Sequence, residues 1–394
     1  MSVRAPANRG LAIILALAAI SAMGSMAIHM LVPALPALAL ELHLRPEQAQ
    51  LAISVYLGGL GAGQLLAGPL VDRLGRRPVL LAGLALYILG ALASALAPTL
   101  PVLLAARLAQ AMGGAAGVVT ARVMVSDIFG RAESARRQAT LMMIVLVSPA
   151  LAPVVGGLLA ALGGWRSIPW VLTAVAGGAI LVALLMLPET RPAADPATAA
   201  RGGLLRDLAR LLRNRRFALA TLTLAGGSSA LYMFLASAPF LLVRSFGLSE
   251  SEAGPCFLAV AAASILGTRL VGPLSQRADA LAAGTLLILA GSVIELALAL
   301  AGLTGALPLI APMLLLGLGA GIVGPSAITL ALFAEEGLAG TATSLAGAAQ
   351  MLASGAATVL LGRFAPVDML RLGVALVIAG GIAFAATLLQ PRNA

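Results

Sequence analysis

Apolar runs long enough to cross a lipid bilayer recur along the whole chain, separated by short turns that carry charges, proline or glycine. A transmembrane helix needs about 20 mainly apolar residues, whereas the strands of a membrane barrel alternate between apolar and polar positions, which these runs do not. The pattern therefore predicts an all-α membrane protein. Its twelve expected transmembrane helices cover residues 11–36, 48–70, 78–97, 100–126, 138–160, 168–187, 218–241, 252–274, 280–302, 307–331, 340–361 and 368–389.

One connection, residues 188–216, is longer and more polar than the others and divides the chain into two six-helix halves. We expect an N-terminal bundle at 1–187, a linker at 188–216 and a C-terminal bundle at 217–394. Within the linker, leucines interleaved with arginines suit a short amphipathic helix on the membrane surface, and a plain solvated linker fits the same residues. These leucines are Leu204, Leu205, Leu208, Leu211 and Leu212.

The two halves carry an internal repeat. Residues 63–73 align with 267–277, 204 positions later, with six of eleven positions identical, which predicts a tandem duplication. The first copy continues into a charged turn at 68–78. Its glycines let two helix ends reverse direction, Asp72 can cap or lie near a helix N-terminus, and its arginines favour the cytoplasmic side.

Composition excludes a soluble globular protein. Of 394 residues, 60% are hydrophobic and 10% are charged, and the mean hydropathy is +1.03. Cys256 is the single cysteine, so one chain can form neither a disulfide nor a thiol metal site. No Walker A sequence or HExxH motif is present. We therefore expect no cofactor, no metal and no ATP-driven or metalloenzyme chemistry.

The net charge of +10 comes with arginine as the sole basic residue type besides two histidines. Such a balance would suggest nucleic acid as the partner of a soluble protein, but these arginines lie in short loops with almost no aromatic residues between them. With both termini in the cytoplasm, seventeen arginines lie on that side and five on the other. The positive-inside bias therefore predicts this orientation, with the linker cytoplasmic and no nucleic-acid partner.

The charged turn at 68–78, its weakened copy after the eighth helix and the two six-helix halves together resemble the major facilitator superfamily. More narrowly, residues 30–36, 107–113, 121–127 and 152–157 are similar to the twelve-helix drug:proton antiporters of the bicyclomycin and chloramphenicol resistance type. The resemblance implies a multi-pass transporter of the bacterial inner membrane, acting as a monomer and not as an enzyme. It also implies alternating access, in which two bundles rock about a central site.

The same resemblance implies a conformational lock that closes the cytoplasmic side when the transporter faces outward. An alternative is that the arginines of the turn only set the topology. The lock residues are Gly68, Asp72, Arg73, Gly75, Arg76, Arg77, Asp127 and Arg131.

The fifth helix carries Pro153, Gly156 and Gly157 of the antiporter motif. It departs from the usual glycine-rich pattern at Ser148 and Ala152, but both are small, so close packing and a proline kink remain possible.

Three ionisable residues inside the spans are candidates for proton coupling, because such groups are costly in hydrocarbon. His29 stands where relatives usually place an aspartate, and it can either carry a proton or serve as a neutral hydrogen-bonding group. Arg107 matches the arginine that the family uses near its proton site, with structural pairing as the alternative. Glu295 is the carboxylate squarely inside a span, and it can take part in coupling or bind a neighbouring helix.

Methionines and aromatic residues form a deformable apolar wall that suits varied small molecules. The residues expected to line the central cavity are Met26, Met30, Tyr56, Gln110, Arg122, Tyr232, Met233, Phe234, Phe240, Arg269 and Gln350. The sequence thus predicts an exporter of amphenicol-like or bicyclomycin-like molecules in exchange for protons. A metabolite exporter or uniporter of the same fold, for a sugar or amino acid, and a non-transporting membrane receptor are the alternatives.

Overall fold

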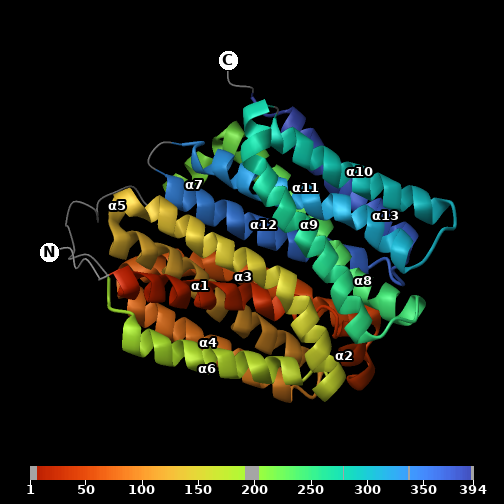
Figure 1. Cartoon of the computed structure of the whole chain (residues 1–394), viewed down its shortest axis with the longest axis horizontal. Coiled ribbons are helices and arrows are strands. Elements are labelled where there is room, and N and C mark those ends of the chain that lie inside the picture. Colours follow the sequence, from red (N-terminus) through yellow and green to blue (C-terminus); the bar gives the residue numbers. More distant parts are fainter. Residues whose placement is uncertain (1–6, 191–203, 278, 336–337, 392–394) are drawn as a thin grey trace.

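The structure is a computed structural model that describes residues 7–190, 204–277, 279–335 and 338–391. Within these ranges the regular elements are helices (Figure 1). They are α1 (Ala7–His29), α2 (Leu35–Glu41), α3 (Pro46–Leu74), α4 (Arg76–Leu96), α5 (Leu100–Gly163), α6 (Ser167–Met186), α7 (Leu204–Arg213), α8 (Arg215–Phe240), the π-helix η1 (Leu241–Ser245), α9 (Glu250–Arg277), α10 (Ala280–Leu300), α11 (Ala306–Leu332), α12 (Ala339–Gly362) and α13 (Met369–Leu388). Among the described residues, eleven helical segments are long and apolar enough to span a membrane, and Leu151–Gly163 is a shorter apolar segment within α5.

Helix α5 supplies two spans. Its 64 residues would measure about 96 Å if straight, three times the roughly 30 Å of a bilayer core. The two halves instead run in opposite directions along α1. The contacts are Gly117 with Ile20 and Arg107 with Ala27 in the first half, and Ser148 with Ala22 and Gly156 with Met30 in the second. The expected fourth and fifth helices are therefore both present, although the backbone stays helical through the turn that the sequence predicted between them.

The first predicted helix, residues 11–36, is interrupted. Helix α1 ends at His29, residues 30–34 form turns, and α2 starts at Leu35. Pro33 explains the break, because it has no N–H to donate to the carbonyl four residues earlier and its ring collides with the preceding turn. His29 consequently lies at the C-terminal end of α1.

The chain is an all-α membrane protein with twelve transmembrane helices in two six-helix bundles. Figure 1 shows the helices up to α6 together on one side and those from α8 on the other. Most inter-helix contacts stay within these two groups, and the principal contacts between the groups are α3 with α12 and α5 with α9. Close approach depends on small residues: a Cβ on Gly61 would lie 2.8 Å from Leu352 Cγ, and one on Gly355 would lie 2.9 Å from the Ser54 carbonyl oxygen.

The seam between α3 and α12 covers only part of these helices. At one end a Cβ on Gly362 would lie 3.5 Å from Glu47 Cβ, and at the other a Cβ on Gly347 would lie 2.8 Å from Gln64 Oε1. Between these points the hydroxyls of Ser54 and Thr358 are 2.6 Å apart in a buried hydrogen bond. The seam therefore joins the bundles over the arginine-poor half of the membrane.

Beyond Gln64, α3 leaves the other bundle. A Cβ on Gly68 would have no neighbouring atom within 4 Å, and the Asp72 side chain is 75% exposed. In the orientation that the arginines predict, the α3–α12 contact thus lies on the outer side, and among the described residues α3 does not contact the other bundle at its cytoplasmic end.

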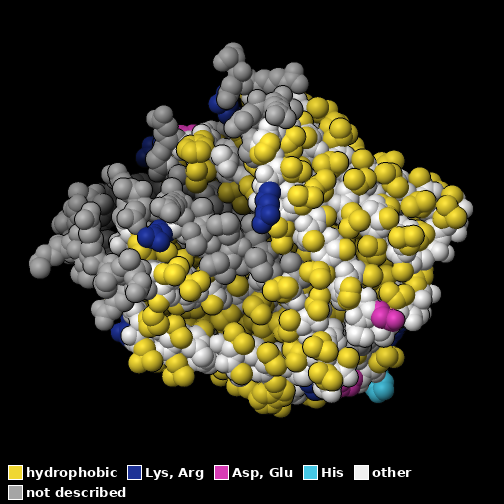
Figure 2. Space-filling view, in the orientation of Figure 1, with side chains coloured by type: hydrophobic (Ala, Val, Ile, Leu, Met, Phe, Trp, Pro, Cys, Tyr) yellow, Lys and Arg dark blue, Asp and Glu magenta, His cyan; other side chains and the backbone are white. Residues whose placement is uncertain are grey.

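The outer surface of the molecule suits a lipid environment. Figure 2 shows a face dominated by hydrophobic side chains with isolated charged groups. Leu185, Leu162 and Leu307 are 84%, 78% and 75% exposed, which in a membrane protein means contact with acyl chains and not with water.

Candidate functional site

Arg107 is a buried guanidinium at the centre of the N-terminal bundle, with 3% of its surface exposed. It donates to Gln110 Oε1 at 2.8 Å and to the backbone carbonyl of Ala27 in α1 at 3.0 Å. Its guanidinium carbon lies 4.1 Å from the centre of the Tyr56 ring, a cation–π arrangement. Arg107 thus ties α5 to α1 and α3. Its acceptor on α1, Ala27, lies two residues before His29 in the chain.

His29 faces the opposite bundle. Its ring centroid lies 6.3 Å from that of Tyr232 on α8, while its Nδ1 lies 2.8 Å from the carbonyl oxygen of Ser25. A carbonyl oxygen can only accept a hydrogen bond, so Nδ1 carries the proton in the neutral ring. His29 therefore spans the boundary between the two bundles with a fixed ring orientation.

One buried polar atom beside Arg107, Tyr56 Oη, has no hydrogen-bond partner among the described residues. The Tyr56 side chain is fully buried, and such an unsatisfied group is costly. We use the term central polar cluster for the residues that meet here, which are Ser25, His29, Tyr56, Arg107, Gln110 and Tyr232. The cluster retains hydrogen-bonding capacity for a further partner.

Carboxylates are absent from this cluster. Fourteen of the 15 acidic residues in the sequence lie in connections, in α7 or near the ends of the spans, and Glu295 is the remaining one. Glu295 is fully buried on α10, and its Oε2 lies against Gly373 of α13. It therefore faces a neighbouring helix of its own bundle. Arg269, which the sequence predicted in the central cavity, is exposed on α9.

The other predicted cavity residues separate into several environments. Met26 on α1 and Gln350 on α12 are partly exposed, and Gln350 Nε2 donates to Ser228 Oγ on α8 at 2.6 Å. Phe234 packs against Phe257, with ring centroids 6.0 Å apart, inside the C-terminal bundle. Met30 is buried in the turn after α1, and Phe240 is buried at the end of α8.

A cavity of about 580 Å³ lies elsewhere, among α8, α12 and α13. Met233 lines it together with apolar side chains such as Ala357 and Ile378, and Arg371 lines it as well. The cavity belongs to the C-terminal bundle, so Met233 lies on a different side of α8 from the central polar cluster.

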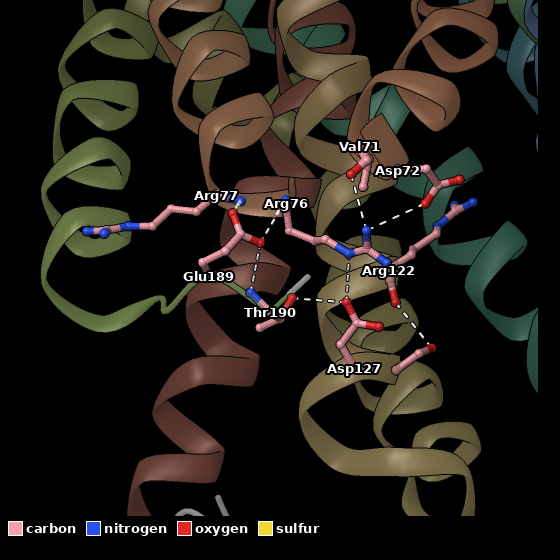
Figure 3. Close-up of polar contacts among 9 residues, drawn as sticks. Val71, Asp72, Arg76, Arg77, Arg122, Asp127, Glu189 and Thr190 are labelled. Carbon is pink, nitrogen blue, oxygen red and sulfur yellow. Dashed lines mark hydrogen bonds and ion pairs between the residues drawn. The ribbon is translucent and has the colours of Figure 1, made fainter. Parts of the chain in front are cut away.

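A second polar group lies at the arginine-rich helix ends (Figure 3). Arg76 at the start of α4 donates through Nε to Asp127 Oδ2 of α5 at 2.8 Å and through Nη1 to the Val71 carbonyl. Asp72 precedes Arg76 by four residues, and its Oδ1 lies 3.6 Å from Arg76 Nη1. Arg122, which the sequence predicted in the central cavity, also lies beside this group (Figure 3). The structure thus brings Arg76 and Asp127 together within one bundle.

Glu189 and Thr190, just after α6, complete this group although the sequence interpretation did not include them. Glu189 accepts the backbone N–H groups of Arg76 and Arg77 at 2.9 and 3.1 Å, and Thr190 Oγ1 donates to Asp127 Oδ2 at 3.0 Å. Glu189 therefore takes the capping role at α4 that the sequence suggested for Asp72. The name inner charge cluster is used below for Asp72, Arg76, Arg77, Asp127, Glu189 and Thr190.

The remaining predicted residues have simpler surroundings. Gly75 has φ +99°, a conformation that favours glycine, and Arg73 is exposed in the last turn of α3. The Arg131 side chain lies outside the described residues. A Cβ on Gly156 would overlap the Met30 carbonyl. A Cβ on Gly254 of α9 would lie 3.3 Å from the Pro153 carbonyl oxygen. The fifth-helix motif, which also includes the buried Gly157, thus packs against the turn after α1 and against α9.

Comparison with known proteins places the whole chain among transporters. Residues 15–358 match the family described as Major Facilitator Superfamily. Multidrug resistance protein D of Escherichia coli (strain K12) is 32% identical over 350 residues, which cover 88% of each chain. Chloramphenicol resistance protein of Pseudomonas aeruginosa is 32% identical over 338 residues, 85% of this chain and 80% of the relative.

Solved structures share the fold. A bacterial homolog of the human lysosomal transporter Spinster, in an inward-facing and unoccupied conformation, superposes with a TM-score of 0.77 at 18% identity and covers 98% of both chains. A D-xylose-proton symporter gives a TM-score of 0.74 at 15% identity, with 97% of both chains covered.

Proposed function

Because this chain belongs to the Major Facilitator Superfamily, we propose that it exports small drug-like molecules, of the amphenicol or bicyclomycin type, in exchange for protons. The observation that carries the proposal is the position of His29, which faces Tyr232 of the other bundle while Arg107 holds the preceding turn of α1. A protonatable ring at the boundary between two moving bundles can sense both cargo and conformation. The protein would act as a monomer in the bacterial inner membrane.

Transport would proceed by alternating access. The conformation seen here, closed along the α3–α12 seam and open at the arginine-rich end, would receive cargo from the cytoplasm. Closing that end would bring the exposed Asp72 toward the C-terminal bundle, and opening the outer end would break the Ser54–Thr358 hydrogen bond. Asp72 and the glycines of the turn would then act as the lock.

The inner charge cluster supports this scheme because it makes the lock a rigid unit. Arg76, Asp127 and Glu189 connect the start of α4, the middle of α5 and the segment after α6 within one bundle. A rigid-body movement of the bundle would therefore carry Asp72 as a fixed part of its surface.

The named relatives support drug export as the activity. Two of them, at 32% identity over most of this chain, are called a multidrug resistance protein and a chloramphenicol resistance protein.

Liposomes containing the purified protein and loaded with labelled chloramphenicol, florfenicol or bicyclomycin test the proposal. An inward-directed proton gradient should accelerate release of at least one compound, and protein-free liposomes give the baseline. Release that is carrier-dependent but indifferent to the gradient would favour a uniporter. Binding of a compound with no flux would favour a receptor, and either result would contradict proton exchange.

A further inference from the structure

The ring of His29 presents one free nitrogen. Because Nδ1 donates to the Ser25 carbonyl at 2.8 Å, the neutral ring keeps its lone pair on Nε2. Ser25 Oγ lies 3.3 Å from Nδ1 as well, so both polar groups of Ser25 are beside the same nitrogen. In its neutral form His29 is therefore a hydrogen-bond acceptor at Nε2, and a proton bound there abolishes that function.

Among the described residues, the groups placed around the C-terminal end of α1 are one guanidinium and two phenols, and no carboxylate. From α5 comes Arg107, from α3 Tyr56 and from α8 Tyr232. Neither α6 nor residues 138–163 of α5 contain an ionisable residue. Glu295, the carboxylate well inside a span, packs against α13. A cation placed beside His29 would lose its hydration without gaining a counter-charge, which is unfavourable at low dielectric.

We propose that this site selects uncharged cargo carrying a hydroxyl or N–H group, which donates to Nε2 of His29. The inference rests on the proposed drug:proton exchange and specifies its substrate class. Tyr56 Oη, buried and without a partner among the described residues, leaves further hydrogen-bonding capacity in the same cluster.

The same geometry explains how cargo and proton would exclude each other. A donor group of the cargo and a proton both need the Nε2 lone pair, so binding of one displaces the other. An anionic cargo would instead bind more tightly to the protonated ring, which is the wrong linkage for exchange. A cationic cargo would exclude the proton, but the site has no carboxylate to bind such a cation. A neutral donor satisfies both requirements.

Equilibrium binding to the full-length detergent-purified protein tests this assignment. The probes are chloramphenicol, which is neutral and bears hydroxyls, tetraphenylphosphonium as a lipophilic cation and tetraphenylborate as its anionic counterpart. Chloramphenicol affinity should fall on acidification, approaching about tenfold per pH unit once His29 is largely protonated, as displacement of one proton requires. Tetraphenylphosphonium should bind weakly at every pH.

Two substitutions separate hydrogen bonding from protonation. His29→Gln keeps an acceptor and cannot take up a proton, so chloramphenicol should still bind with no pH dependence. His29→Leu should weaken binding by about tenfold, the loss of one hydrogen bond. Arg363→Gln, a change at an exposed arginine, serves as the control, and thermal unfolding verifies that each variant is folded.

The results distinguish the substrate class from the exchange itself. Tight tetraphenylphosphonium binding, or chloramphenicol affinity that rises on acidification, overturns the inference. If tetraphenylphosphonium is also exchanged for protons in liposomes, drug:proton exchange stands and only the selectivity fails. If no cargo is moved by a proton gradient, the proposed function fails and the inference fails with it.

Discussion

At the scale of single residues, the central polar cluster depends on one guanidinium. Arg107 donates to Gln110 Oε1 and to backbone carbonyls of Ala27 and Ala52 while its charge lies over the Tyr56 ring. A planar guanidinium can reach several acceptors at once, which a lysine ammonium cannot do in the same geometry. The residue therefore has a structural effect that is separable from any effect on cargo.

Arg107→Gln should lower thermal stability in detergent. The change leaves the buried oxygen of Gln110 without its donor, and such an unsatisfied group costs about 1–3 kcal/mol. Arg363→Gln should leave the unfolding temperature unchanged. Equal unfolding temperatures for Arg107→Gln and the wild type would contradict the observed contacts.

Gly156→Ala should prevent correct packing of the fifth span, because the new Cβ would overlap the Met30 carbonyl. The matched control is Gly177→Ala in α6, where a Cβ meets nothing within 4 Å and the gain in helix propensity is about 0.8–1.0 kcal/mol. Folded yield and unfolding temperature should fall for the first variant and hold or rise for the second. The reverse order would show that α1 and α5 are not this close.

His29 and Arg107 could be selected from the sequence because ionisable residues in apolar runs stand out. Glu189 could not, because its role arises from a contact with a helix start 113 positions away along the chain. Arg122 is the opposite case, a residue wrongly assigned to the site. The sequence predicted that it lines the central cavity, but the course of α5 places it beside the inner charge cluster.

At the scale of elements, the spans follow from hydrophobic length, and their ends follow from particular residues. The short breaks before α5 and α11 occur where the apolar pattern predicted them, at Ala97–Thr99 and Ala301–Gly305. The break after His29 was not predicted, because a proline within an apolar run can either kink a helix or end it. The helical turn inside α5 was also missed, since charged residues fit a loop and a helix equally well.

Helix α4 begins with a cap supplied by Glu189, in the segment just after α6. Glu189→Ala removes the acceptor for the N–H groups of Arg76 and Arg77, and loss of a helix cap typically costs about 0.5–2 kcal/mol. Hydrogen exchange should therefore accelerate in the first turn of α4. Thr190→Val, which removes only the hydrogen bond to Asp127, is the matched control, and unchanged exchange in Glu189→Ala would rule out the capping role.

At the scale of the whole molecule, the conformation is defined by the end, outer or cytoplasmic, at which the two bundles contact each other. The α3–α12 seam is packed through small residues from Glu47 to Gln64, and the last three residues of α3, Asp72 to Leu74, are exposed. The fold class and the two bundles were predictable from hydrophobic pattern and repetition. The choice of conformation was not, because both conformations use the same helices.

A cysteine pair at Ser54 and Thr358, in a chain with Cys256 replaced by Ala, should cross-link on oxidation because the native hydroxyls are 2.6 Å apart. The cross-link should stop transport by holding the outer side closed, and a reductant should restore it. Each single-cysteine variant should be insensitive to oxidation. Full activity of the cross-linked protein would show that the seam does not open during transport.

The central claim, exchange of cargo for a proton at His29, is tested most directly by proton release from detergent-purified protein at mildly acidic pH. Adding chloramphenicol to the wild type should release protons in proportion to the cargo bound. His29→Gln should bind chloramphenicol and release none. Equal release from both proteins, or binding to the wild type without release, would contradict the account.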